Sequence, residues 1–181
     1  QWLLKHGDGV YDIAFSVDSV QNAYEGCVKR GAKSVGDLFV VDDKKGSFSK
    51  ASIQSYGDCI HSFISNNNYQ LWAPNFIDNR KKQKDLQDTK IELIDHVVAN
   101  VEVDKMDFWK EYYEKVFGFC AFVRFDETDI STKYSSLKSV VLRSKNWKVR
   151  LPINEPAEGL KKSQIEEYLD FNEGPGIQHI A

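Results

Sequence analysis

Two histidines and one aspartate occupy the same place in a pattern that repeats along the chain. His96 follows Asp12 by 84 residues and precedes His179 by 83 residues. Each of the three opens a short β-prone stretch. Imidazoles are common ligands of transition metals, and two that converge suit Fe, Zn, Cu, Ni or Mn. A single histidine on a strand is more often a surface or core residue, so the repeat alone favours a metal site at His96 and His179.

A carboxylate that joined the two imidazoles facially would make non-heme Fe(II) oxygen chemistry the leading class. No carboxylate of this chain is identified by pattern as that ligand. By the same spacing we expect it about one module beyond Ala181. Asp12 holds the equivalent place in the first module, where a lone carboxylate makes a poor metal site. His6 and His61 have no partners in the repeat, and we expect them to be structural.

The elements that would position these residues follow one order twice. A strand over residues 10–17 precedes a helix that Asp18 or Ser19 can cap and that Gly31 ends. A strand over residues 91–101 contains His96 and precedes a helix that Asp104 would cap. Further strands are predicted at residues 38–41, 49–56, 59–64, 119–125, 139–143 and 147–151, and residues 152–159 are predicted to be a loop. Ser163 and Glu166 form a capping-box pattern.

These elements describe a βαβββ module of about 84 residues, used twice, with a third just beginning. Two such modules can pair their sheets into a half-open barrel, so we predict an α+β fold. The polar stretch at residues 80–90 is predicted to be a linker between two domains, residues 1–79 and residues 91–181. Its cations could form a nucleic-acid patch, but a solvated linker is the more common role of such a stretch.

Composition excludes several classes of function. The net charge of −3 gives no electrostatic reason to expect nucleic acid or an anionic membrane. No apolar run approaches the roughly 20 residues that span a bilayer. The three cysteines, Cys27, Cys59 and Cys120, include no CxxC pair, which indicates reduced core thiols in a cytoplasmic protein. The chain opens on Gln1 and stops two residues past His179, so we expect it to be an internal piece of a longer protein.

Several segments resemble 4-hydroxyphenylpyruvate dioxygenases. They are residues 6–10 (HGDGV), 94–98 (IDHVV), 113–119 (YEKVFGF), 151–156 (LPINEP), 162–165 (KSQI) and 172–181 (NEGPGIQHIA). They occur in the family's order and with matching spacing over essentially the whole chain. The resemblance implies a truncated vicinal oxygen chelate fold, glyoxalase- or extradiol dioxygenase-like, with a non-catalytic N-terminal domain and a catalytic C-terminal domain. Residues 91–181 would then hold the first catalytic module and the start of the next.

The resemblance also implies the chemistry. His96 and His179 match two Fe(II) ligands, and the third ligand, a glutamate, belongs to a module beyond Ala181. The reaction would convert 4-hydroxyphenylpyruvate and O2 to homogentisate and CO2 in the catabolism of tyrosine and phenylalanine, in a cytoplasmic homo-oligomer. Ser139, Asn154, Gln164 and Gln178 match polar substrate-binding positions.

Each substrate-binding match has an ordinary structural alternative. Ser139 could satisfy a sheet edge, Asn154 a turn, and Gln164 the first turn of a helix. Gln178 adjoins His179, so in a regular strand it would point to the opposite face. Two other functions stay open at this point. One is 4-hydroxymandelate synthase, and the other is a metal-free binding protein of the same fold. With two ligands and half a barrel, we expect the 181-residue chain to bind Fe(II) weakly and to be inactive alone.

Overall fold

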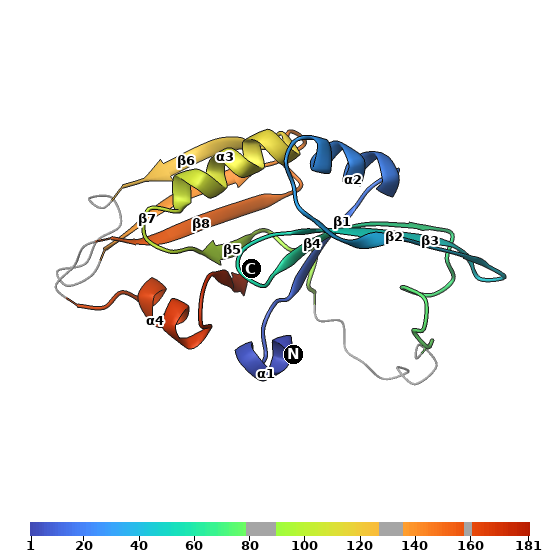
Figure 1. Ribbon diagram of the computed structural model, residues 1–181, viewed down its shortest axis with the longest axis horizontal. Coiled ribbons are helices and arrows are strands. Elements are labelled where there is room, and N and C mark those ends of the chain that lie inside the picture. Colours follow the sequence, from blue (N-terminus) through green and yellow to red (C-terminus); the bar gives the residue numbers. More distant parts are fainter. Residues whose placement is uncertain (79–89, 127–135, 158–160) are drawn as a thin grey trace.

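The computed structural model describes residues 1–78, 90–126, 136–157 and 161–181, which form two neighbouring sheets and four helices (Figure 1). The first sheet follows helix α1 (Trp2–His6) and contains β1 (Asp12–Ser16), β2 (Ser34–Asp43), β3 (Gly46–Gln54) and β4 (Ile60–Asn67), with α2 (Val20–Lys29) after β1. The second contains β5 (Val97–Asn100), β6 (Cys120–Phe125), β7 (Ser136–Arg143), β8 (Arg150–Ala157) and β9 (Gly176–Ile180), with α3 (Met106–Phe117) after β5 and α4 (Gln164–Phe171) before β9.

The predicted repeat is confirmed by the strand order. The first sheet runs β1-β4-β3-β2, and the second contains the same arrangement as β5-β8-β7-β6. In both sheets the first strand of the module pairs in parallel with the last strand. Strand β9 then pairs antiparallel with β5, as the opening strand of a further module would.

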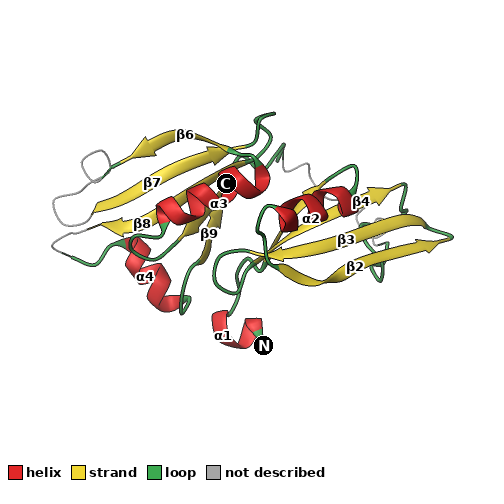
Figure 2. Ribbon diagram, turned by 45° about the horizontal axis from the view of Figure 1, so that its top comes forward, coloured by secondary structure: helices red, strands yellow, loops and turns green. Residues whose placement is uncertain are grey.

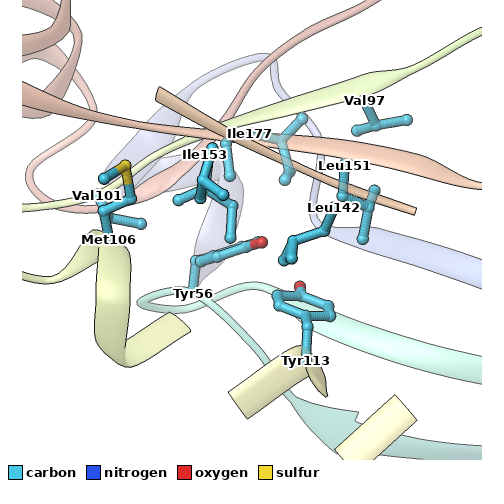
Figure 3. Packing of buried hydrophobic residues seen from close by; sticks show 11 residues of the cluster. Tyr56, Val97, Val101, Met106, Tyr113, Leu142, Leu151, Ile153 and Ile177 are labelled. Atoms are coloured by element: carbon cyan, nitrogen blue, oxygen red, sulfur yellow. The ribbon is translucent and has the colours of Figure 1, made fainter. Parts of the chain in front are cut away.

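The two modules share a hydrophobic core. Helices α2 and α3 lie on the same side of the two sheets (Figure 2), and α2 contacts α3. Tyr56, from the turn after β3, is 1% exposed and lies among side chains of the second module, including Met106 and Tyr113 (Figure 3). The first module therefore supplies part of the core of the second.

Several expected helix ends are confirmed. The Ser19 hydroxyl accepts a hydrogen bond from the backbone N–H of Asn22, and Ser163 and Glu166 form a reciprocal capping box. Gly118 ends α3 in the left-handed conformation, with φ of 69°. The prediction for Asp104 was wrong. The N-cap is Lys105, and the N-terminus of α3 is instead satisfied by the Glu155 carboxylate on β8, which accepts from the backbone N–H of Met106 at 3.0 Å.

Two strand predictions also need correction. Residues 91–96 precede β5 rather than belonging to it, and residues 152–157 are strand rather than loop. Proline at Pro152 and Pro156 suggested a loop because it lacks the N–H that a sheet ladder needs. The Asn154 carbonyl accepts from the N–H of Val101 beside β5, and alternate residues face the same neighbour. Both prolines therefore face the β5 side, where β8 pairs with only two residues.

The predicted linker mostly lies outside the described residues, so the domain boundary stays a prediction. Cys27 and Cys59 are buried as expected, whereas Cys120 is exposed on β6 and is not a core thiol. No helix of the described residues combines the length and apolarity needed to cross a membrane.

Candidate metal centre and substrate face

The structure brings His96 and His179 together at one end of the β5–β9 pair. His179 lies opposite Val98, and the backbone of Ala181 exchanges a hydrogen bond with His96 just before β5. The two imidazole rings have centroids 5.8 Å apart and planes inclined at 77°. The side chain of His96 is 32% exposed. Their convergence is what the repeat predicted.

The His96 ring has a fixed orientation. Its Nδ1 lies 2.8 Å from the Asp95 carboxylate, which also pairs with the Arg150 guanidinium at the start of β8. The hydrogen bonds from His96 and Arg150 lower the pKa of Asp95, which keeps it ionised as an acceptor. A histidine whose Nδ1–H donates to a carboxylate presents the lone pair of Nε2 to a metal.

The His179 ring has an equivalent partner because β9 is irregular. Val98 pairs with His179 but Ala99 pairs with Ile177, so Gln178 is an extra residue in the strand. Such a bulge interrupts the alternation of side chains. The Gln178 Oε1 atom lies 2.9 Å from Nδ1 of His179, so these adjacent side chains contact each other. The expectation that Gln178 points to the opposite face holds only for a regular strand.

Asp12 shows what the same position becomes in a module without a metal pair. Its Oδ2 atom accepts hydrogen bonds from Lys50 on β3 and Ser62 on β4, at 2.9 and 2.7 Å. The lysine ammonium supplies the positive charge that this carboxylate needs, so Asp12 is an internal ion pair in the first module.

Three polar side chains form a row across the second sheet, on the face opposite α3. Ser139 on β7 lies opposite Asn154 on β8, which in turn lies opposite Asn100 on β5. Cross-strand partners point to the same face. Val140 and Ile153, next in register, point instead into the core beneath α3. This row lies on the His96 face, because residues 96, 98 and 100 alternate with core residues of β5.

Asn100 is the residue that the sequence analysis missed. It is fully buried, its Oδ1 atom accepts from Asn154 Nδ2 at 3.4 Å, and its own Nδ2 has no hydrogen-bond partner among the described residues. The signal was an asparagine four residues after His96, on the same face of the strand. Four residues of extended chain span at most about 13 Å, so one small molecule could reach from His96 to Asn100. His179, opposite Val98, lies nearer to Asn100 along the strand.

Gln164 is not brought into this row. It is exposed at the first turn of α4, with no hydrogen bond to Ser139 or Asn154 in the described parts of the chain. A cavity of about 480 Å³ lies elsewhere, between the modules, where Trp109 and Tyr112 of α3 face Gln54. It is lined by neither histidine.

The donor set fits two ligands of a metal site. Both rings have Nδ1 engaged by an acceptor, and within the described residues Nε2 of each ring has no hydrogen-bond partner. Among the described residues no group of three or more histidine, cysteine, aspartate or glutamate side chains could hold a metal ion.

Repeated βαβββ modules with this strand order define an α+β protein of the vicinal oxygen chelate type. A comparison of the sequence with family models finds no match. Curated proteins nevertheless match nearly the whole chain. The chain is 44% identical over 184 residues to the 4-hydroxyphenylpyruvate dioxygenase of Yarrowia lipolytica, covering 99% of the chain and 47% of that protein. The Dictyostelium discoideum 4-hydroxyphenylpyruvate dioxygenase is also 44% identical over 184 residues, at 99% and 50% coverage.

These matches confirm that the chain resembles 4-hydroxyphenylpyruvate dioxygenases throughout, and it spans about half the length of the curated relatives it matches. A solved triple mutant of 4-hydroxymandelate synthase from Streptomyces coelicolor has the same fold, with a TM-score of 0.83, 21% identity, and coverage of 99% of this chain and 50% of that one. A fusion protein of a xylose isomerase-like TIM barrel and 4-hydroxyphenylpyruvate dioxygenase matches with a TM-score of 0.59 at 18% identity, over 99% of this chain and 26% of that one.

Proposed function

We propose that the chain is part of a non-heme Fe(II) dioxygenase that converts 4-hydroxyphenylpyruvate and O2 to homogentisate and CO2. The observation that carries the proposal is the convergence of His96 and His179, each with Nδ1 held and Nε2 free. Names of relatives that match 99% of the chain support the reaction. Iron, tyrosine catabolism, a cytoplasmic location and a homo-oligomer belong to the same proposal.

In this proposal the two imidazoles would hold the metal together with a glutamate outside this chain. Bound Fe(II) would supply the redox chemistry with O2. The protein's own contribution is to hold the substrate at a fixed distance from the imidazoles. If the 2-oxoacid group of 4-hydroxyphenylpyruvate lay near His96 and His179, its phenol group would point along β5 toward the row of Ser139, Asn154 and Asn100.

The polar row suits a neutral hydroxyl. Ser139, Asn154 and Asn100 offer donors and acceptors without a competing anion. The unpartnered Nδ2 group of Asn100 is a buried donor available to an oxygen of the substrate or of a bridging water. Gln178 would have two roles, because it orients His179 and adjoins the same face. Gln164 would join the site only by reaching across from α4.

Binding of Co(II) to the 181-residue chain tests the metal proposal. We expect weak binding through two imidazole nitrogens, and a loss of affinity of at least about 10-fold in His96→Ala or His179→Ala. Glu111→Ala, on the exposed face of α3, is the matched control and should bind as the parent does. Unchanged Co(II) affinity in either histidine variant would remove that residue from the site.

The second candidate is a 4-hydroxymandelate synthase, because a solved protein of that name has the same fold. That match is 21% identical and speaks for the fold alone, whereas the relatives at 44% identity are dioxygenases. In the full-length protein the product decides. Formation of homogentisate would support the dioxygenase, and formation of 4-hydroxymandelate would support the synthase. A full-length protein that neither turns over the substrate nor binds a metal would support a metal-free binding protein.

A further inference from the structure

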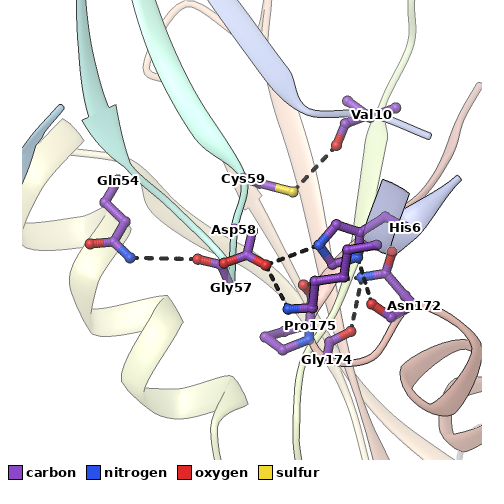
Figure 4. Close-up of polar contacts among 10 residues, drawn as sticks. His6, Val10, Gln54, Gly57, Asp58, Cys59, Asn172, Gly174 and Pro175 are labelled. Carbon is purple, nitrogen blue, oxygen red and sulfur yellow. Dashed lines mark hydrogen bonds and ion pairs between the residues drawn. The ribbon is translucent and has the colours of Figure 1, made fainter. Parts of the chain in front are cut away.

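His6, in the HGDGV segment, lies far in sequence from the segment that it contacts. Its ring is buried, with the side chain 3% exposed, between two acceptors (Figure 4). Nδ1 lies 2.6 Å from the backbone carbonyl oxygen of Asn172, at the C-cap of α4. Nε2 lies 3.0 Å from the Asp58 carboxylate, in the turn between β3 and β4. One ring therefore joins three segments from both modules.

The partners decide the protonation state that fits. A carbonyl and an ionised carboxylate only accept hydrogen bonds, so only a ring that carries protons on both nitrogens satisfies both. A neutral ring would turn a lone pair toward one of the acceptors. Hydrogen bonds from Lys5 and His6 lower the pKa of Asp58, so the carboxylate is available as the counter-ion. The geometry matches an imidazolium.

Two further contacts converge on the same turn. Gly57, with φ of 48°, lies against Pro175 so closely that an added Cβ would come 2.7 Å from the proline carbonyl oxygen. Val10 forms a β-bridge with Ile177. All three contacts thus run from the first module to residues 172–177, which lead directly into Gln178 and His179.

We propose that His6 is a positioning residue, which as an imidazolium clamps the Asn172 turn to the Asp58 turn and thereby sets the position of the β9 strand that presents His179. The link to a metal rests on the proposed function, whereas the clamp itself does not. The first module, although it carries no metal ligand of its own, would then determine the geometry of the histidine pair.

Backbone hydrogen exchange tests the clamp directly. In His6→Gln we expect amide exchange in β9 to rise at least about 10-fold while the amide of Ile53, in the core of the first module, stays protected. Lys5→Gln removes the other, exposed partner of Asp58 and is the matched control, with β9 exchange within about twofold of the parent. Unchanged β9 exchange in a folded His6→Gln variant would overturn the clamp.

The charge requirement has its own readout. In NMR spectra of the folded parent, under the conditions of the exchange experiment, both ring nitrogens of His6 should carry a proton, and these signals should be absent from His6→Gln. Among the charged groups, Asp58 faces the ring directly. Lys5 pairs with the same carboxylate. Glu173, in the turn between α4 and β9, acts electrostatically on Lys5. A folded parent in which only one ring nitrogen of His6 carries a proton would refute the imidazolium role.

Cu(II) electron paramagnetic resonance then separates the clamp from the metal site. The parent should show coupling to two imidazole nitrogens, and His6→Gln to fewer or to a mixture. Loss of β9 protection with an unchanged copper spectrum would overturn the link between the clamp and the histidine pair. A parent that binds no copper would refute the proposed function but leave the exchange result standing.

Discussion

At the scale of single residues, the four histidines differ in what their ring nitrogens face. His96 and His179 each have Nδ1 against an acceptor, and in the described parts of the chain nothing engages Nε2, which suits a metal ligand. His6 has acceptors at both nitrogens. His61 is buried, with Nε2 beside the hydroxyls of Tyr113 and Ser55. Only the first pair combines partial exposure with a free nitrogen, so hydrogen-bonding partners separate the roles that residue type alone leaves equal.

Asp95→Asn should weaken metal binding while leaving the fold intact. The amide can still accept from Nδ1 of His96 but loses the charge that makes the imidazole a stronger base. Outer partners of this kind typically change metal affinity by about 10- to 100-fold, and we expect the lower end because Asp95 is half exposed. Co(II) titration measures the change. Asp107→Asn, which also breaks an aspartate–arginine pair on the surface, is the control and should bind cobalt normally.

The sequence predicted that His96 and His179 converge but not how their rings are oriented. The convergence of His96 and His179 was predicted from their spacing in the repeat, and a local irregularity in a strand does not change that spacing. The contact of Gln178 with His179 depends on a one-residue bulge against β5, and the register that creates it cannot be read from β9 alone. Asn100 was missed because its burial depends on α4 and β8 covering that face.

At the scale of elements, local signals located most of the helices and strands. Capping residues and glycines act within one turn, so Ser19, Ser163 and Gly118 could be assigned from neighbouring residues. The start of α3 could not be, because its cap comes from Glu155, a residue 49 positions away on β8. A helix end that depends on a residue far away in the sequence cannot be predicted from the residues next to it.

Glu155→Gln should therefore destabilise the start of α3. The buried carboxylate accepts from the first helical N–H and also faces Lys138 at 3.6 Å. Loss of the charge at a helix N-terminus should lower the unfolding free energy by about 1 kcal/mol. Urea unfolding measures this loss. Glu111→Gln, exposed on the same helix, is the control, and an equal stability of the two variants would show that Glu155 is not the effective cap.

At the scale of the whole molecule, the two modules are joined through side chains as well as through the chain. Tyr56 and His61 of the first module pack with Tyr113 of α3, and His61 also packs against Phe117. The repeat predicts two similar modules but says nothing about their interface, because each contact joins positions more than fifty residues apart. This interface includes His61, a titratable group that is 1% exposed.

Burial lowers the pKa of His61 from 6.5 to about 4, so the folded protein holds this ring neutral. The unfolded chain takes up the proton first as the pH falls. Stability from this residue is therefore complete above about pH 6.5 and declines to a loss of about 3 kcal/mol near pH 4, with about 2 kcal/mol lost at pH 5. His61→Gln keeps an acceptor for the Tyr113 hydroxyl but cannot titrate.

Urea unfolding at pH 7 and pH 5 should show a smaller decrease in His61→Gln than in the parent, by about 2 kcal/mol. His179→Gln removes an exposed histidine and is the control, with a decrease close to that of the parent. A variant too unstable to measure would be replaced by NMR titration of the parent, in which the His61 ring should remain neutral at pH 5 while the protein is folded. A charged ring at pH 5 in the folded protein, or equal pH dependence in the parent and His61→Gln, would show that the interface between the modules tolerates the charge. In that case protonation of His61 would not be the cause of a loss of stability at low pH at the interface between the modules.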